Sequence, residues 1–230
     1  MPETARPLAL IFGGDPALFS IVGLSLWISL CATLIATLAG LPIGAALALA
    51  RFPGRGALIV IVNALMGLPP VVVGLLVFQL LSRSGPLGAL GLLFTPAAMI
   101  IAQAILITPI VAALTRQTVE DLWGEYADEL TALGAGRAQR ILTLLYDARL
   151  SLLTAVLAGF GRAAAEVGAV MIVGGNIEGF TRTMTTSIAL ETSKGDLALA
   201  LSLGAVLITV ILLVNLLAWW ARRLAGAPQG

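Results

Sequence analysis

The chain has 230 residues, of which 59% are hydrophobic and 11% charged, and its formal net charge is +1. A soluble domain carries roughly a quarter charged residues, so the composition excludes an ordinary soluble protein and predicts a membrane protein. Because the chain has no histidine and one cysteine, Cys31, we expect no metal site and no histidine-based catalysis. The near-neutral charge indicates no nucleic-acid partner.

Five apolar segments are each long enough to cross a bilayer as an α-helix, which takes about 20 residues. A helix is favoured in lipid because it satisfies every backbone amide within its own segment. The sequence therefore predicts an all-α polytopic membrane protein, with residues 1–230 forming a single transmembrane domain. In chain order, the expected spans cover about residues 20–50, 57–82, 94–115, 150–173 and 197–221.

Small residues and prolines mark the first two spans. Gly40 and Gly44 form a small-xxx-small pair that would let a second helix approach closely. In the second span, Pro69 and Pro70 remove backbone hydrogen bonds and prevent a straight helix. Non-helical backbone at membrane depth is tolerated where protein buries it or where it lines a cavity. Two interpretations stay open for these prolines: a packing kink, or a place in the pore or gate.

A polar segment, residues 120–149, follows the third span and is long enough for two short helices. Tyr126, Leu130 and Leu133 recur at helical spacing and would form the apolar stripe of the first helix. Gly134, Ala135 and Gly136 would end that helix, and the second would begin near residue 139.

The first of these helices is acidic, with Asp128 and Glu129 on its polar side. Helices that rest on a membrane surface usually carry Lys and Arg on the polar face. A docking surface for a second protein is therefore favoured over a helix lying on the membrane.

Arg162 and Glu166 stand well inside the fourth span, where a charge costs about 2.5–3.5 kcal/mol even on insertion scales. Their i, i+4 spacing lets them pair along one helix face. Either Arg162 faces a water-filled path as a pore or gate residue, or the pair locks the span against its neighbours. The locked pair is favoured, because Glu166 would repel an anion that Arg162 attracts.

Basic residues favour an N-terminus outside the cell and a C-terminus in the cytoplasm, because the side with more Arg and Lys faces inward. In that orientation the polar segment is cytoplasmic. The inner residues are Arg51, Arg55, Arg116, Arg137, Arg140, Arg149, Arg222 and Arg223, and the outer residues are Arg6, Arg83, Arg182 and Lys194. The outer stretch before Lys194 is rich in threonine and is expected to form a partly buried polar element.

The polar segment resembles the cytoplasmic "EAA" loop of ABC-type importer permeases. That pattern reads Glu-Ala-Ala, three residues, then Gly, and here Gly134 is the anchor, with Asp128 in the Glu position. The chain also departs from the pattern at Asp147, where Pro is usual.

A narrower resemblance links most of the chain to permeases that import oxyanions. It rests on LPPVVVGLL at 68–76, SGPLG at 84–88 and GNIEGFTRTMTTSIA at 175–189. The stretches AGFGRAAAEVGAVMIVGGNIEG and ALETSKGDLALALSLG are most similar to tungstate permeases.

The resemblance implies the ABC importer permease fold, with two copies forming the pore in the cytoplasmic membrane. Two separate ATPase subunits would bind ATP and Mg²⁺ and receive a coupling loop, and an extracytoplasmic binding protein would deliver the oxyanion. The chain itself would hold no cofactor and catalyse nothing. The implied coupling residues are Asp128, Glu129, Leu130, Ala132, Leu133, Gly134, Ala135 and Arg137.

Molybdate or sulfate are alternative substrates. An autonomous secondary transporter is disfavoured, because Glu166 is the only candidate ion-coupling carboxylate within the spans and already has a neighbour. A membrane enzyme is disfavoured further, because no nucleophiles, acids or metal ligands cluster in the sequence.

Overall fold

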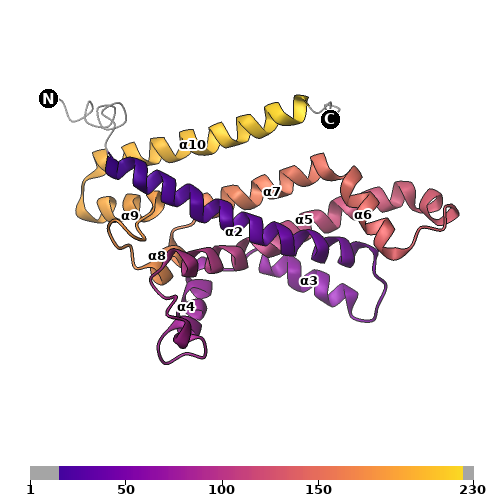
Figure 1. The fold of residues 1–230 in the computed structure, drawn as a ribbon, viewed down its shortest axis with the longest axis horizontal. Helices are drawn as coiled ribbons and strands as arrows, with labels where there is room; N and C mark the ends of the chain where they lie inside the picture. Colours follow the sequence, from indigo (N-terminus) through magenta and orange to yellow (C-terminus); the bar gives the residue numbers. More distant parts are fainter. Residues whose placement is uncertain (1–15, 225–230) are drawn as a thin grey trace. The chain divides into compact units, whose positions relative to one another are not determined.

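The computed structural model describes residues 16–224, and every regular element in that range is helical, as predicted (Figure 1). Arg6, which belongs to the predicted outer set, lies outside the described residues. The elements are α2 (Pro16–Leu49), α3 (Arg55–Leu65), α4 (Pro70–Leu81), the short 3₁₀ helix η2 (Gly88–Leu90), α5 (Pro96–Ala132), α6 (Arg137–Asp147), α7 (Arg149–Ala164), α8 (Gly168–Gly174), α9 (Met184–Lys194) and α10 (Leu197–Leu224).

Three helices, α2, α5 and α10, are long and apolar enough to cross a membrane, and up to five spans result if two bent helix pairs each count as one. In α5, 61% of the most apolar window is buried inside the protein, against 22% in α2 and 17% in α10. α5 is therefore a core helix, whereas α2 and α10 present apolar side chains outward, as lipid-facing helices do. The five-span scheme and its orientation stay predictions.

The second and fourth predicted spans are not continuous helices. In the second, α3 ends at Leu65 and α4 begins at Pro70, which confirms the break predicted from the prolines. In the fourth, α7 ends at Ala164 and α8 begins at Gly168. No proline marks this second break, and the sequence did not predict it.

The contacts within the chain form two compact units. Within the described residues, the first unit contains 16–32, Pro69–Gln103 and Gly161–Leu217, and the second contains Thr33–Leu68, Ala104–Phe160 and 218–224.

In the second unit, α2 packs closely against α5 through the predicted glycine pair. An ideal Cβ on Gly40 would lie 2.8 Å from Val111 Cβ, and one on Gly44 would lie 2.4 Å from Ala112 O. Since real Cβ atoms do not approach a carbonyl oxygen so closely, only glycine fits at 44 without a shift. The expected close approach of a second helix at Gly40 and Gly44 is confirmed.

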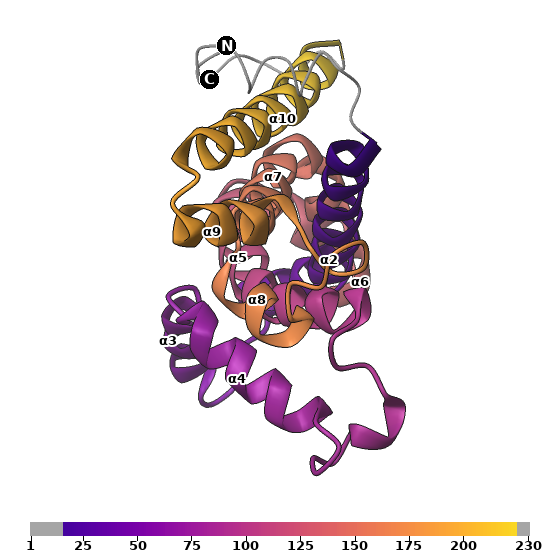
Figure 2. The ribbon, with the colours of Figure 1, turned by 90° about the vertical axis from the view of Figure 1, so that its left-hand side faces the viewer.

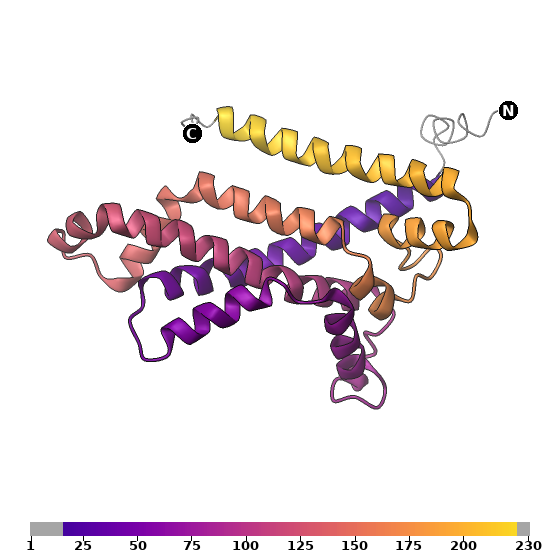
Figure 3. The same cartoon turned by 180° about the vertical axis from the view of Figure 1, so that it is seen from behind.

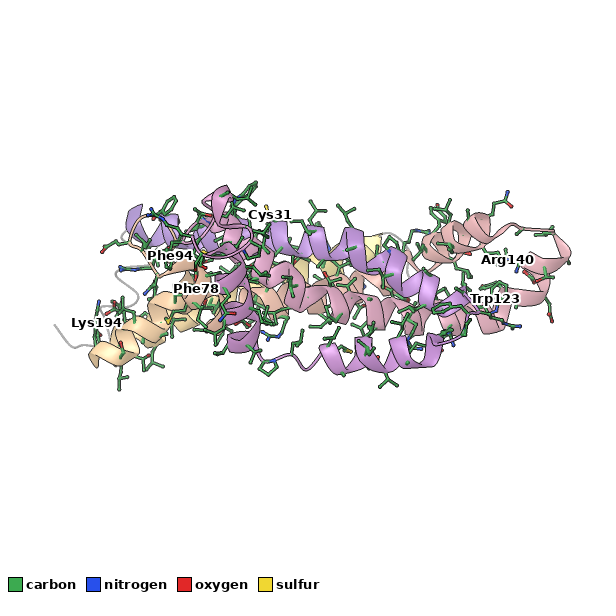
Figure 4. All side chains as sticks on the ribbon, turned by 90° about the horizontal axis from the view of Figure 1, so that it is seen from below. Cys31, Phe78, Phe94, Trp123, Arg140 and Lys194 are labelled. Carbon is green, nitrogen blue, oxygen red and sulfur yellow. The ribbon has the colours of Figure 1, made fainter. Side chains whose placement is uncertain are left out.

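In the first unit, α4 packs against α8, and Gly74 of α4 lies directly over Ala169 (Figure 2). The loop that leads from α4 to α5 is tied to α8 at Phe94, whose backbone N–H donates to Val173 O at 2.9 Å. The Phe94 ring meets that of Phe78 edge-on with centroids 6.0 Å apart, and both rings are labelled in Figure 4.

Candidate functional site

The polar segment 120–149 begins as a direct continuation of the third span. α5 runs without interruption from Pro96 to Ala132, so the acidic stretch is the end of a 37-residue helix. The expectation of a separate first helix was wrong, because hydropathy falls after Thr115 while helix-forming residues continue and no proline intervenes. The expected second helix is present as α6, which turns back beside the end of α5 (Figure 3).

The turn after α5 is a Schellman motif with Gly134 at its centre. Gly134 has φ +66°, in the left-handed region that side chains with a Cβ enter at a cost. The N–H of Ala135 donates to Leu130 O and that of Gly134 donates to Thr131 O, both at 3.0 Å. These bonds satisfy carbonyl groups that the helix end would otherwise leave without partners. The predicted helix end at Gly134 is confirmed.

An apolar cluster fastens the segment to the second unit. Leu130 of α5 and Leu144 of α6 are buried together with Ala45 of α2. Tyr126 packs against this cluster, as the predicted stripe requires, but Leu133 is 81% exposed and does not belong to it. Because three helices share these buried contacts, the segment is packed against α2 and is not a loop without tertiary contacts.

Residues 128–136, which we call the tip, present most of their side chains to solvent. Asp128, Glu129, Ala132 and Leu133 are all exposed. In the described part of the chain, neither Asp128 nor Glu129 takes part in an ion pair. α6 begins at Arg137, directly after the tip. The tip thus combines carboxylates that have no ion pair among the described side chains with an exposed leucine, which suits recognition by a complementary protein surface.

A three-residue ion network stands at the base of this segment. Glu120 of α5 pairs with both Arg116 and Arg55. Arg55 also donates from Nε to Leu47 O at 2.7 Å and from Nη2 to Ala48 O at 3.2 Å. It therefore satisfies carbonyls at the end of α2 while joining the α2–α3 turn to α5.

Sequence reasoning used Arg55 and Arg116 only for orientation and missed this network. The i, i+4 spacing of Arg116 and Glu120 was an available signal. The third member, Arg55, is 65 residues from Glu120, and no local pattern connects residues so far apart.

Two interruptions of helical structure lie beside each other in the first unit. At one, Pro69 is extended with ψ 122° and Pro70 starts α4, the position where a helix tolerates proline. The other is residues 165–167, between α7 and α8. An ideal Cβ on Gly168 would lie 3.0 Å from Val71 Cγ2, so the two breaks are in close contact. The structure thus brings the predicted pore residues of the second and fourth spans together.

Glu166 organises the second break. Its side chain is 2% exposed, pairs with Arg162 and accepts a hydrogen bond from the backbone N–H of Ala169 at 3.0 Å. Its backbone oxygen accepts from Thr185 Oγ1 at 2.7 Å. One carboxylate therefore neutralises Arg162 and caps α8, which supports the structural interpretation of the pair. A role of Arg162 in conduction stays a prediction.

Other polar groups complete the surroundings of this break. Gln103 donates from Nε2 to Ala163 O at 3.1 Å, near the end of α7. The threonine-rich stretch predicted to be partly buried is buried: Thr181, Thr183, Thr185, Thr186 and Ser187. In lipid, such interior hydroxyls satisfy backbone groups that an irregular chain leaves free.

Residues 40–225 match the family described as binding-protein-dependent transport system inner membrane component. The chain belongs to this family of transport permeases. It is accordingly a multi-pass protein of the inner membrane, in agreement with its apolar helices.

Three relatives of this permease cover between 71% and 90% of its length. It is 42% identical over 205 residues to a probable anion ABC transporter permease protein of Haloferax volcanii (87% of this chain, 88% of the relative). It is 41% identical over 208 residues to a tungstate uptake system permease protein of Peptoclostridium acidaminophilum (90% and 91%). The corresponding tungstate protein of Campylobacter jejuni is 40% identical over 163 residues (71% and 68%). The chain is an ABC-type importer permease of the oxyanion branch.

Proposed function

We propose that this permease is the membrane subunit of an ATP-driven importer of tungstate. Two of the similar permeases carry tungstate uptake in their names, and a third is described as an anion permease. The stretch around Glu166 also resembles the corresponding sequence of tungstate permeases. Molybdate and sulfate remain the alternative substrates.

Two copies of the chain form the pathway in this proposal. α4 buries one face against α8 and leaves its other face exposed and apolar, at Val71, Val72, Leu75, Leu76 and Leu80. That exposed face begins at Pro70, next to the break at 165–167, so a second copy placed there would enclose irregular backbone from both chains. Pro69, Pro70, Arg162 and Glu166 are then the residues nearest the gate.

The tip couples the pathway to a separate ATPase subunit, and this part of the proposal rests on one observation. The tip is exposed, and its carboxylates have no ion pair among the described side chains. Its base is held against α2 by the buried cluster and by the Arg55–Glu120–Arg116 network. A displacement of the tip would therefore move α2, α5 and α6 with it, because no flexible loop separates the tip from these helices. ATP and Mg²⁺ belong to that partner, and this chain supplies no catalytic group and no cofactor.

The proposed orientation follows the charge distribution, and the proposed binding protein follows from the family. Five spans place the N-terminus outside and the C-terminus in the cytoplasm, so that the tip faces the ATPase. An extracytoplasmic binding protein would deliver the oxyanion on the opposite side and make most of the selection between oxyanions.

Reconstitution tests the proposal. The permease and its ATPase, in liposomes with the binding protein outside, are expected to take up tungstate only when ATP is present on the ATPase side. Uptake by the permease alone would establish an autonomous transporter instead. Uptake of molybdate or sulfate in preference to tungstate, at equal occupancy of the binding protein, would reassign the substrate.

A further inference from the structure

The second unit contains a cavity of about 580 Å³ at the turn between α2 and α3. Its apolar lining includes Leu49 at the end of α2, Ile141 in the middle of α6 and Trp123 of α5. Two arginines, Arg51 from the turn and Arg140 from α6, also line it. Figure 4 shows Trp123 and Arg140 close together.

Arg140 is held in place for a ligand. Its Nε donates to Ala135 O at 2.9 Å, and its guanidinium carbon lies 5.2 Å from the centre of the Trp123 ring. Within residues 16–224, its Nη groups make no hydrogen bond to protein. The side chain is fixed through one edge and its ring contact, and the donors on its other edge stay available.

Arg51 is exposed, and its guanidinium has no acceptor in the described chain. Its neighbour Arg55 contrasts with it, because Arg55 is satisfied by two carbonyls and Glu120. Among the described residues, none that lines the cavity is acidic, and Glu120 is already shared between two arginines. The cavity therefore has two cationic groups with free donors and no carboxylate to neutralise them.

The chemistry of the cavity identifies the ligand class. Two guanidinium groups with available N–H donors suit a phosphate group, which arginine binds through parallel hydrogen bonds. The apolar lining and the size of the cavity, which is in the usual range for organic ligands, exceed what a bare inorganic anion requires. The cavity also lies where the 32-residue apolar stretch of α2 ends, with Trp123 and Phe52 beside it, and tryptophan favours the edge of a bilayer.

We propose that this cavity binds the phosphate headgroup of an acidic phospholipid, with Arg51 and Arg140 on the phosphate and Trp123 beside the glycerol region. Basic pockets between membrane helices bind such headgroups elsewhere on the same physical grounds. A lipid held there would bridge the α2–α3 turn and α6, and so would stabilise the base on which the tip stands.

The test uses the purified full-length permease in neutral detergent, with phosphatidylglycerol or phosphatidylcholine added and retained lipid counted by native mass spectrometry. We expect phosphatidylglycerol to be retained in preference to phosphatidylcholine. Arg51→Gln should lower phosphatidylglycerol affinity about fivefold, as expected for one arginine near a charged surface, and Arg51→Lys should restore most of it. Arg149→Gln is the matched control, because it removes the same charge from the same unit at an exposed residue that does not line the cavity.

Three results would overturn the proposal. The first is that Arg51→Gln and Arg149→Gln lose bound lipid equally, or that neither variant loses it. The second is displacement of phosphatidylglycerol by millimolar inorganic phosphate or glycerol 3-phosphate, which would make the cavity a site for free anions. The third is loss of the bound lipid when the ATPase is added, which would assign the two arginines to acidic residues of the partner. Arg51→Gln should fold, since Arg51 has no protein partner in the described chain, and its unfolding temperature in phosphatidylcholine provides the check.

Discussion

Gly134 permits the turn that separates α5 from α6. Its φ is +66°, a backbone conformation that glycine adopts freely and that strains a residue with a Cβ. Nothing lies within 4 Å of an ideal Cβ at this position, so a substitution acts through backbone strain and not through a clash. Gly136, two residues later, has φ −71°, which any residue adopts. The two glycines therefore form a matched pair for testing the turn.

Gly134→Ala should lower the free energy of unfolding by about 1 kcal/mol and reduce ATP-driven uptake, because the tip no longer keeps its shape. Gly136→Ala should change both quantities little. Equilibrium unfolding in detergent and uptake in liposomes measure the two effects. Equal behaviour of the two variants would show that the left-handed turn is unimportant for coupling.

A second prediction concerns the stability that the Arg162–Glu166 pair provides. Arg162→Leu leaves a buried carboxylate without its charge partner, and should destabilise the protein by about 2 kcal/mol. Glu166→Gln in the same chain should recover part of this loss, because glutamine can still accept from Ala169 N–H.

A double-mutant cycle on unfolding in detergent measures the coupling between the two side chains. The Glu178–Arg182 pair has the same i, i+4 spacing at 3.4 Å, and its carboxylate is 85% exposed. It is the control and should show much weaker coupling, because water screens the exposed charge. If Arg162→Leu leaves stability unchanged but lowers transport, Arg162 lines the path and the structural interpretation is wrong.

Among the elements, α2 depends on its close contact with α5. Gly44→Ala would place a Cβ 2.4 Å from Ala112 O, and overpacking of this kind costs about 1–3 kcal/mol. Gly23→Ala, on the same helix with nothing within 4 Å of an ideal Cβ, should instead be neutral or slightly stabilising, because alanine favours helix. Thermal unfolding of the two variants in one detergent compares them. Equal unfolding temperatures would contradict the packing described here.

Helix ends show where sequence reasoning succeeds and where it fails. Pro69 and Pro70 predicted the break before α4, and Gly134 predicted the end of α5. Proline and glycine have backbone preferences of their own, which do not depend on tertiary contacts. Residues 165–167 contain no such residue, and contacts made by Glu166 with Ala169 and Thr185 fix that break. The length of α5 was missed for a different reason, since hydropathy marks where a span leaves the membrane and not where its helix stops.

At the scale of the whole molecule, the apolar runs were enough to predict an all-helical membrane protein, and the polar segment was enough to suggest a docking element. The pairing of Arg55 with Glu120 and the cavity beside Arg51 could not be predicted, because they join residues far apart in the chain. They depend on which helices lie side by side, and no single segment records that information.

In the proposed function, the tip binds a separate nucleotide-hydrolysing subunit. A photo-crosslinking residue placed at the exposed Leu133 of the assembled transporter tests it most directly, with the same residue placed at exposed Leu201 of α10 as the control. We predict that Leu133 crosslinks to the ATPase subunit and that Leu201 does not. Crosslinking of Leu133 to lipid alone, in a complex that contains the ATPase and hydrolyses ATP, would contradict the account.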